Sequence, residues 1–306
     1  MNTPVKLGSY ALGLIATGAA AAGVGHAVGP IGPVGSAAQH GAAHIESDPV
    51  AVERTPGGLM VSQDGYTLAL AEDSLPAGKA TPVSFRIEDR DGMPVTAYAE
   101  SHDKELHFIA VRRDMTGFQH VHPQLADDGT WSTALDLTPG DWPMFADFVP
   151  SAHGEALTLG ADLAVPGAYR PRALPEPAAV AHVDGYTVSL DGRLQAGTES
   201  ELTLSVSRDG APVTDLQPYL AAYGHLVVLR EGDLAYLHVH PAGEPGDGTT
   251  EPGPDITFYA TTPSVGDYRL FLDFRHSGVV RTAEFTVRAE GDGADTGGHG
   301  DDGHGH

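Results

Sequence analysis

Short runs in which hydrophobic and polar residues alternate fill residues 58–289, and Gly, Pro or Asp separates one run from the next. Alternation with a period of two predicts β-strands that bury one face, and this part of the chain has no convincing helical period. The C-terminal half holds seven such runs: Tyr186–Leu190, Glu201–Ser207, His225–Arg230, Leu234–His240, Ile256–Thr261, Tyr268–Arg275 and Val279–Val287. Seven strands in about 110 residues are typical of an immunoglobulin-like or cupredoxin-like β-sandwich. We therefore predict an all-β protein, with an eight-stranded barrel as the alternative.

The same motifs occur twice, in the same order, in residues 58–168 and 178–289. The matching segments include Asp64–Leu70 with Asp184–Leu190, His107–Arg112 with His225–Arg230, and Phe145–Phe148 with Phe271–Phe274. Repetition of this kind predicts two copies of one domain. The Pro-rich residues 169–177 predict an extended, fairly stiff linker between the copies.

The two ends of the chain differ from the repeats. Residues 1–29 carry one positive charge, Lys6, followed by an uncharged run of small and apolar residues. This pattern predicts an apolar helix that acts as a signal peptide or an uncleaved signal anchor, so the body should be extracytoplasmic, either membrane-anchored or secreted. Residues 30–57 are rich in Gly, Ala and Pro and predict a flexible linker. Residues 290–306 lack apolar residues larger than alanine and predict a disordered tail.

Each copy carries a His-x-His-Pro motif, with a third histidine thirteen residues before the first His of the pair. A hairpin turn at Glu231–Gly232 would place His225 directly opposite His238, and alternation would keep His240 on the same face. Opposed side chains have Cβ atoms about 4.5–5.5 Å apart, so three imidazoles could reach one ion at about 2.0–2.1 Å. We therefore predict one three-histidine metal site in each copy, formed by His107, His120 and His122 and by His225, His238 and His240.

The surroundings of the first set indicate where it should lie. The face that carries the histidines also carries Ile109, Val111 and Phe118, whereas Arg112 and Gln119 alternate onto the other face. We therefore expect the histidine face to be the inner face of the sandwich. The alternative is that the histidines are packing residues. Each buried neutral imidazole needs both a donor and an acceptor partner, however, and three neighbouring rings are hard to satisfy in this way without an ion.

Several further residues are weaker candidates. Asp147 and Asp273 occupy equivalent positions in a late strand and could be a fourth ligand, the carboxylate that orients a ligating histidine, or surface residues. His102 has Leu220 as its counterpart, so the repeat indicates no role for it. The remaining candidate ligands are His153, His276 and Met115 in the repeats, and His299, His304 and His306 in the tail.

Composition narrows the chemistry. The chain has 306 residues, no cysteine and a formal charge of −24. The lack of cysteine excludes disulfides, thiolate-ligated zinc, iron–sulfur clusters and blue-copper centres. The negative charge disfavours nucleic acid and anionic membrane surfaces as partners and favours cations. No catalytic motif such as G-x-S-x-G or H-E-x-x-H is present.

In its two His-Val-His-Pro motifs and its Lys6–Ala11 opening, the chain resembles two groups of proteins. These are bacterial extracytoplasmic copper-handling β-sandwich proteins and the membrane-anchored or secreted YtkA-like proteins of actinobacteria. That resemblance implies metal binding or homeostasis without catalysis, with another extracytoplasmic metal-handling protein as a possible partner.

We expect copper or zinc as the ion, since imidazole suits both and copper binds more tightly in general. Protons should compete with the ion as the pH falls through about 6.5. The alternatives are a zinc-dependent hydrolytic or hydratase-type enzyme, and a structural or adhesive immunoglobulin-like module without metal.

Overall fold

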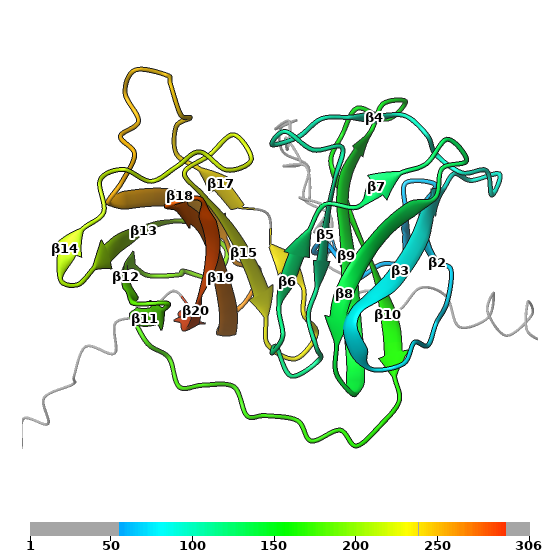
Figure 1. The fold of residues 1–306 in the computed structure, drawn as a ribbon, viewed down its shortest axis with the longest axis horizontal. Helices are drawn as coiled ribbons and strands as arrows, with labels where there is room; N and C mark the ends of the chain where they lie inside the picture. The colour runs from blue at the N-terminus through cyan, green and yellow to red at the C-terminus, as the bar shows by residue number, and fades with distance from the viewer. Residues whose placement is uncertain (1–54, 238, 292–306) are drawn as a thin grey trace, which may run out of the picture. The chain divides into compact units, whose positions relative to one another are not determined.

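A computed structural model describes residues 55–237 and 239–291, with the backbone alone of His240 (Figure 1). Within these residues all regular secondary structure is β-strand, which confirms the all-β prediction. The described part holds no helix that is long and apolar enough to cross a membrane. The predicted N-terminal helix, flexible linker to residue 54, and tail from residue 292 lie outside the described residues.

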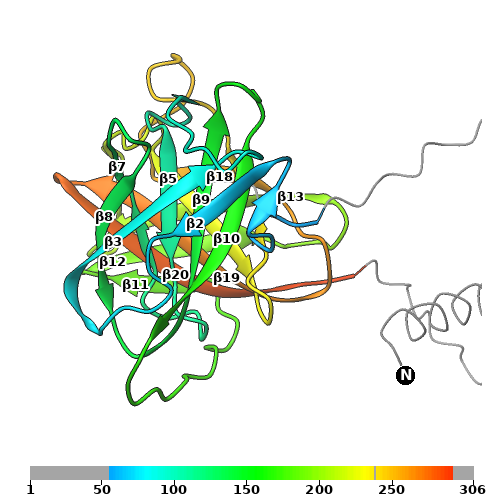
Figure 2. The same cartoon turned by 90° about the vertical axis from the view of Figure 1, so that its right-hand side faces the viewer.

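The first sandwich is built from two sheets. One has the strand order β1-β2-β3-β8-β7, and both views show β3 and β8 as neighbours (Figures 1 and 2). Its strands are β1 (Ser62–Gln63), β2 (Tyr66–Leu70), β3 (Gly78–Glu88), β8 (Trp131–Leu137) and β7 (Gln124–Leu125). The other has the order β10-β9-β5-β6, with β4 added on β9. Its strands are β10 (Leu157–Val165), β9 (Gly140–Pro150), β5 (Leu106–Ala110), β6 (Gln119–Val121) and β4 (Tyr98–Ala99).

The second sandwich repeats this plan, so the tandem-sandwich prediction is also confirmed. One sheet has the order β11-β12-β13-β18-β17, with β14 on β13, and the other has the order β16-β15-β19-β20. The first contains β11 (Val180–Val183), β12 (Tyr186–Gly192), β13 (Glu199–Arg208), β18 (Asp255–Thr261), β17 (Val239–Pro241) and β14 (Ala211–Pro212). The second contains β16 (Tyr236–Leu237), β15 (Gly224–Arg230), β19 (Gly266–His276) and β20 (Val279–Ala289).

One predicted strand proved to be two. The run Leu234–His240 contains β16, which pairs with β15, and β17, which pairs with β18 in the opposite sheet. The chain therefore changes sheets within the second His-x-His motif. The last strand, β20, ends at Ala289, and Glu290 just beyond it forms an isolated bridge with Gln195.

The strands bury their side chains in two different ways. Strands such as β13, in the sheet that has one solvated face, alternate between buried and more exposed residues. Strands β5 and β19 are buried along both faces over most of their length. One face of each packs into its own sandwich core, where Phe108 and Phe274 lie. The other face therefore needs a second covering layer.

That layer is the other sandwich. The outward faces of the two sheets form one apolar cluster with members from both copies: Ile109, Val111, Met115, Phe145, Val227, Leu229, Leu234 and Phe271. The expectation that the histidine face is the inner face of its own sandwich is therefore wrong. Ile109 and Val111 are apolar because they are covered by the second copy, a contact that alternation within one copy cannot distinguish from a core.

The contacts across this interface are reciprocal. Phe118 of the first copy stacks on Phe271 of the second, with ring centroids 4.0 Å apart and planes at 6°. The equivalent residues in the opposite sense, Tyr236 and Phe145, pack with centroids 5.9 Å apart. In a two-fold interface residue i contacts j and j contacts i, and the two copies follow this rule within a single chain.

The segment before the first sandwich joins the two copies as well. Gly57 accepts a hydrogen bond from the backbone N–H of Tyr236 at 2.8 Å, and Gly58 donates to Thr158 at 2.8 Å. The backbone passes so close to β10 that a Cβ on Gly160 would lie 1.9 Å from the Gly58 carbonyl oxygen. Glycine at position 160 is thus required by this close approach.

Phe271→Ala tests whether the interface holds the two sandwiches together. Phe271 is fully buried, and truncation of a buried Phe costs about 3–5 kcal/mol. We expect the free energy of unfolding to fall by this order and the single unfolding transition to split in two. Differential scanning calorimetry measures both, and the exposed Val265→Ala is the control. A loss below about 1 kcal/mol would contradict the proposed importance of the contact.

Candidate metal centre

The hairpin that carries the histidines has a different register from the predicted one. In the first copy Ile109 pairs with His120, and in the second Val228 pairs with Leu237. Both differ by two residues from the register that placed His225 opposite His238. A shift of two residues preserves the face on which each side chain lies, so the predicted common face is kept although the predicted partner is wrong.

The loop explains this shift in register. Arg230 pairs with Ala235 rather than with Asp233, and Leu234 takes a left-handed conformation with φ 58°. The Asp233 carboxylate accepts hydrogen bonds from the Arg230 guanidinium and from the Ala235 N–H. Asp233 thus stabilises a loop that is longer than the predicted two-residue turn at Glu231–Gly232.

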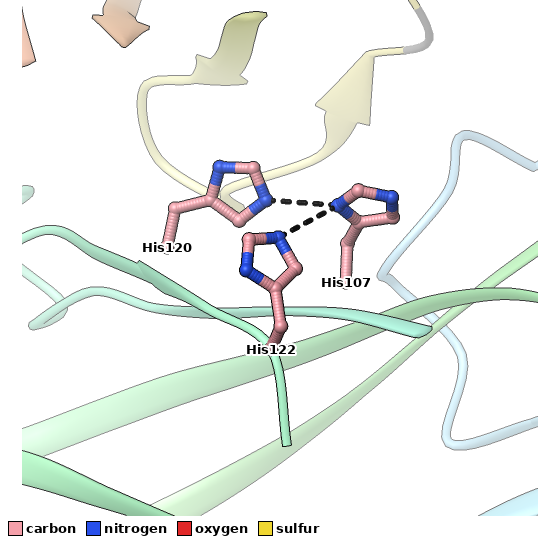
Figure 3. A group of neighbouring side chains, drawn as sticks. All are labelled: His107, His120 and His122. Atoms are coloured by element: carbon pink, nitrogen blue, oxygen red, sulfur yellow. Dashed lines mark hydrogen bonds between the residues drawn. The ribbon is translucent and has the colours of Figure 1, made fainter. Parts of the chain in front are cut away.

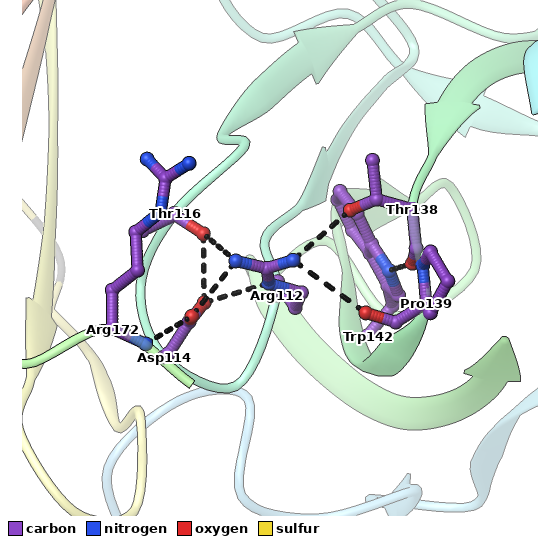
Figure 4. A network of polar contacts seen from close by, with 7 residues as sticks. All are labelled: Arg112, Asp114, Thr116, Thr138, Pro139, Trp142 and Arg172. Atoms are coloured by element: carbon purple, nitrogen blue, oxygen red, sulfur yellow. Dashed lines mark hydrogen bonds and ion pairs between the residues drawn. The ribbon is translucent and has the colours of Figure 1, made fainter. Parts of the chain in front are cut away.

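The first-copy loop is held by a polar network around Arg112 (Figure 4). The Arg112 guanidinium donates to both carboxylate oxygens of Asp114, at 2.9 and 2.8 Å, and to Thr138 at 3.2 Å. The backbone N–H of Arg172, in the linker between copies, also donates to Asp114 at 2.9 Å. This network fixes the turn end of the hairpin and docks the linker against it.

Three histidine rings converge at the other end of this hairpin. Figure 3 shows His107 from β5, His120 from β6, and His122 just beyond it, with their rings pointing toward one another. One nitrogen from each ring lies within 4.8 Å of the other two. His107 Nδ1 lies 3.1 Å from His120 Nε2 and 3.2 Å from His122 Nε2. In a tetrahedral site, two imidazole nitrogens that each lie about 2.0–2.1 Å from the ion are about 3.3–3.4 Å from each other, close to the distances found here.

The outer nitrogens of two rings are already engaged. His107 Nε2 lies 2.9 Å from the carbonyl oxygen of Ser101, which can only accept, so this nitrogen carries the proton. His120 Nδ1 lies 3.0 Å from Asp273 Oδ2, and a carboxylate likewise draws the proton to that nitrogen. These partners leave His107 Nδ1 and His120 Nε2 with lone pairs that face the centre of the triad. Fixing of the tautomer by a carbonyl or carboxylate is usual for metal-ligating histidines.

The carboxylate that orients His120 comes from the other sandwich. Asp273 lies on β19, is buried, and accepts a second hydrogen bond from Thr282 Oγ1 at 2.5 Å. The side chains of His120 and Asp273 are each 5% exposed. The centre is therefore complete only when the two copies are docked, because its ligands belong to one and its orienting carboxylate to the other.

Burial sets the protonation of the histidines. It lowers the pKa of His107 to about 3, helped by the neighbouring His120, although the Ser101 carbonyl acts to raise it. Burial and His120 also lower the pKa of His122 to about 3. Both rings thus stay neutral well below pH 6.5. The expected loss of metal near pH 6.5 stays a prediction.

The other candidate residues fall in several places. Met115 packs in the apolar interface cluster. His153 is exposed and lies edge-on to Tyr66. His276 accepts from the Tyr186 hydroxyl at 2.6 Å and donates to Asp215 at 3.0 Å, the pattern of a structural histidine. The side chains of His238, His240, His299, His304 and His306 lie outside what the structure describes, so their predicted roles stay predictions.

His225 and Asp147 lie beside the first triad. The His225 ring centroid is 6.4 Å from those of both His107 and His120. Asp147 is the cross-strand neighbour of His107, and burial raises its pKa to about 6.

Sequence reasoning passed over His102. Its ring centroid lies 5.3 Å from that of His225 in the other copy and 6.1 Å from that of His107. Comparison of the two copies concealed this residue, because its counterpart is a leucine and its neighbour belongs to the opposite copy. Its left-handed backbone, with φ 50°, has no sequence signal beyond the Asp that follows it.

Comparison by sequence gives one family. A family model described as "Domain of unknown function (DUF8832)" matches residues 61–167 and again residues 181–291. The two matches coincide with the two sandwiches. No curated protein is similar to the chain by sequence.

Several solved structures match the chain at low similarity. The adhesin FdeC of Escherichia coli is 18% identical with a TM-score of 0.24, over 75% of this chain and 65% of FdeC. InvD of Yersinia pseudotuberculosis is 14% identical with a TM-score of 0.24, over 75% of this chain and 58% of InvD. A bacterial integrin-binding invasin is 13% identical with a TM-score of 0.22, over 76% of this chain and 41% of the invasin. At such scores these likenesses give no basis for transferring a function.

The lowered histidine pKa values predict how stability depends on pH. Burial lowers the pKa of His225 to about 4, as it lowers those of His107 and His122 to about 3. Between pH 6.5 and 4.5 these rings take up protons in the unfolded chain but not in the folded one. The stability that these neutral rings contribute is therefore fully present above pH 6.5. It falls as the pH drops below that value, by at most about 1.4 kcal/mol per pH unit for each histidine. Asp147, whose pKa is raised, opposes this trend below pH 6.

Urea unfolding of the metal-free chain at pH 7.0 and 4.5 measures the effect. We expect a loss of several kcal/mol, at most about 6 kcal/mol, dominated by the three histidines. His225→Gln should make the pH dependence shallower, whereas the exposed His182→Gln should leave it unchanged. Equal stability at the two pH values would show that the rings are not buried in neutral form.

Proposed function

We propose that this chain, which belongs to the family described as "Domain of unknown function (DUF8832)" through both of its sandwiches, is an extracytoplasmic protein that binds a transition-metal ion. Copper or zinc is the expected ion, held by His107 Nδ1, His120 Nε2 and His122 Nε2. Export is inferred from the sequence of residues 1–29.

One observation carries the proposal. A neutral imidazole has a single acceptor nitrogen with one lone pair, so His107 Nδ1 can accept one good hydrogen bond. Two ring nitrogens lie within 3.2 Å of it, and one of them, His120 Nε2, belongs to a ring whose proton is drawn to the opposite side by Asp273. Hydrogen bonding among neutral rings therefore leaves one close N···N contact without a proton. A cation at the centre satisfies all three nitrogens together.

The size of the site favours ion binding over catalysis. The cavity beside the triad has a volume of about 70 Å³, against about 300–1,000 Å³ for pockets that take small-molecule substrates. A single ion with one or two waters fits such a space. The three nitrogens leave a coordination position free, as the hydrolytic alternative requires, but a substrate has little room there.

A structural or adhesive module without metal is the second candidate. It is favoured by the apolar interface, which needs no ion, and by the Ser101 and Asp273 contacts, which already anchor two of the rings. If His120 carries both ring protons, it can pair with Asp273 and donate to His107 without an ion. The two candidates differ in whether the centre takes a metal ion.

Isothermal titration of the full chain with Zn²⁺ or Cu²⁺, after removal of metal by a chelator, tests the site. The double change His120→Ala and His122→Ala should remove one tight equivalent. Asp273→Asn should keep the ligands but weaken that equivalent about 10–100-fold, the usual cost of losing a carboxylate that orients a ligand. His182→Ala, an exposed histidine outside the centre, should change nothing.

A second control addresses the tail. A chain ending at Gly291 lacks His299, His304 and His306, and it should keep the tight equivalent and lose weak ones. Tight binding lost with the tail but kept in the His120/His122 double variant would assign the site to the tail instead.

Thermal unfolding separates metal binding from the structural candidate. An ion at a hundred times its dissociation constant stabilises the native state by about 2.7 kcal/mol, which raises the melting temperature. We expect Zn²⁺ to raise it in the wild type and not in the His120/His122 double variant. A melting temperature that ignores zinc, copper and chelator alike would favour the structural module.

A further inference from the structure

The polar centre of the interface has the same reciprocal arrangement as the apolar contacts around it. His107 lies directly opposite Asp147 on the neighbouring strand, and His225 lies directly opposite Asp273. Each aspartate is in turn opposite a threonine of the last strand of its sheet, Thr158 for Asp147 and Thr282 for Asp273. The interface thus brings two equivalent histidine–aspartate pairs together.

His225 is held in the same way as His107. Its Nε2 lies 2.8 Å from the carbonyl oxygen of Tyr219, which occupies the place of Ser101, and 2.9 Å from that of Leu220. Both partners can only accept, so Nε2 carries the proton and Nδ1 keeps its lone pair. The ring lies 6.4 Å from the rings of His107 and His120, measured between centroids. A second lone pair is therefore presented close to the first triad.

Space for an ion exists between these groups. The cavity of about 70 Å³ is lined by His102, His107, His120, Asp147 and His225, among others. A cavity needs about 10–15 Å³ by the same measure to admit a water molecule, so an ion with one water fits. The lining thus includes four imidazoles and two carboxylates, Asp147 and Glu105, together with the ammonium of Lys104. Imidazole and carboxylate donors suit copper or zinc.

The two aspartates differ in how far their hydrogen-bonding capacity is used. Asp273 accepts from His120 and from Thr282, at 3.0 and 2.5 Å. Asp147 accepts from Thr158 at 3.4 Å, a long contact. A carboxylate offers about four lone-pair sites, so Asp147 has capacity left for a cation or for the N–H of a ligating ring.

We propose that His225 and Asp147 belong to a second cation position adjacent to the first, so that the interface holds a paired two-ion centre in which each position draws a carboxylate from the opposite sandwich. The proposal rests on the proposed function, since it needs the first triad to bind an ion. His238 and His240 remain predicted ligands from the sequence alone.

The pairing has an energetic consequence. Two divalent ions so close together repel, and the repulsion is strong where water is largely excluded. The carboxylates of Asp147 and Asp273 supply two negative charges that offset part of it. The second ion should therefore bind, but more weakly than the first, and the difference in affinity should grow when Asp147 is neutralised.

Cu²⁺ is the probe for the test, because two nearby Cu²⁺ ions interact magnetically. The full chain is used with the tail histidines changed to alanine (H299A, H304A, H306A), so that the tail does not contribute copper. Calorimetric titration counts the ions, and electron paramagnetic resonance at two equivalents detects the spin–spin interaction. We expect two ions of unequal affinity and a signal of interacting pairs.

Asp147→Asn and His225→Gln should each weaken the second ion at least tenfold and abolish the pair signal, while the first ion keeps its affinity. Both are conservative in size, and circular dichroism with thermal unfolding shows whether each variant folds. If a variant does not fold, the wild-type spin–spin signal and ion count still decide. His153→Gln, an exposed histidine outside the cluster, is the matched control.

The outcomes distinguish the two proposals. One tight ion and no pair signal in the wild type would overturn the paired centre and leave the proposed function intact. Weakening of the first ion rather than the second by Asp147→Asn would also overturn the assignment of carboxylates. No tight ion at all would overturn the proposed function and the paired centre together.

Discussion

The packing of one sandwich against the other is the contact on which the rest of the structure depends. The outward faces of β5 and β9 are as apolar as a core, and exposure of such large apolar faces to water is unfavourable. The second copy covers them with the equivalent surface of its own. Any polar group on these faces is then removed from water and must find its partners within the interface. His107, His120 and Asp273 do so, and their mutual contacts follow from this burial.

The duplication therefore gives more than two similar domains in a row. In a two-fold dimer each subunit offers the same patch, and side chains are exchanged between partners. Here the exchange takes place within one chain, with Phe118 on Phe271 and Tyr236 on Phe145. The contact from His120 to Asp273 belongs to the same pattern. A site shared in this way depends on docking, which neither copy alone provides.

Much of this could be predicted from the sequence, for reasons that also set its limits. Period-two alternation located most strands, because β12, β13 and β18 bury one face and expose the other. The common face of His107 and His120 was predicted despite a wrong register, since an error of two residues changes the partner and not the face. Strands buried on both faces have no such alternation, and for them the sequence could not distinguish a sandwich core from an interface between sandwiches.

The contacts that complete the centre were beyond this reasoning. Asp273 was a candidate for orienting a histidine, but nothing in the sequence indicates that the histidine belongs to the other copy. The sequence did not indicate His102, because comparison of the two repeats assumes that a functional residue occurs at the equivalent position of both. This assumption fails at an interface between copies. A residue such as His102 can contact the second copy although the equivalent position in that copy carries a different residue type.

The buried triad lacks one positive charge, and this links its two candidate roles. Asp273 is a buried carboxylate whose closest titratable partner is His120, and buried charge is costly unless it is paired. A second proton on His120 can supply the charge, and so can a metal ion bound to His120 Nε2 with the Nδ1 proton still on Asp273. In both cases Asp273 faces a positively charged imidazole system and keeps the same hydrogen bond. The ion has the further advantage of engaging His107 and His122, whose lowered pKa values make them poor acceptors of a proton but leave their lone pairs ready for a metal. Burial therefore keeps these two rings neutral, which is the form that the proposed metal site requires.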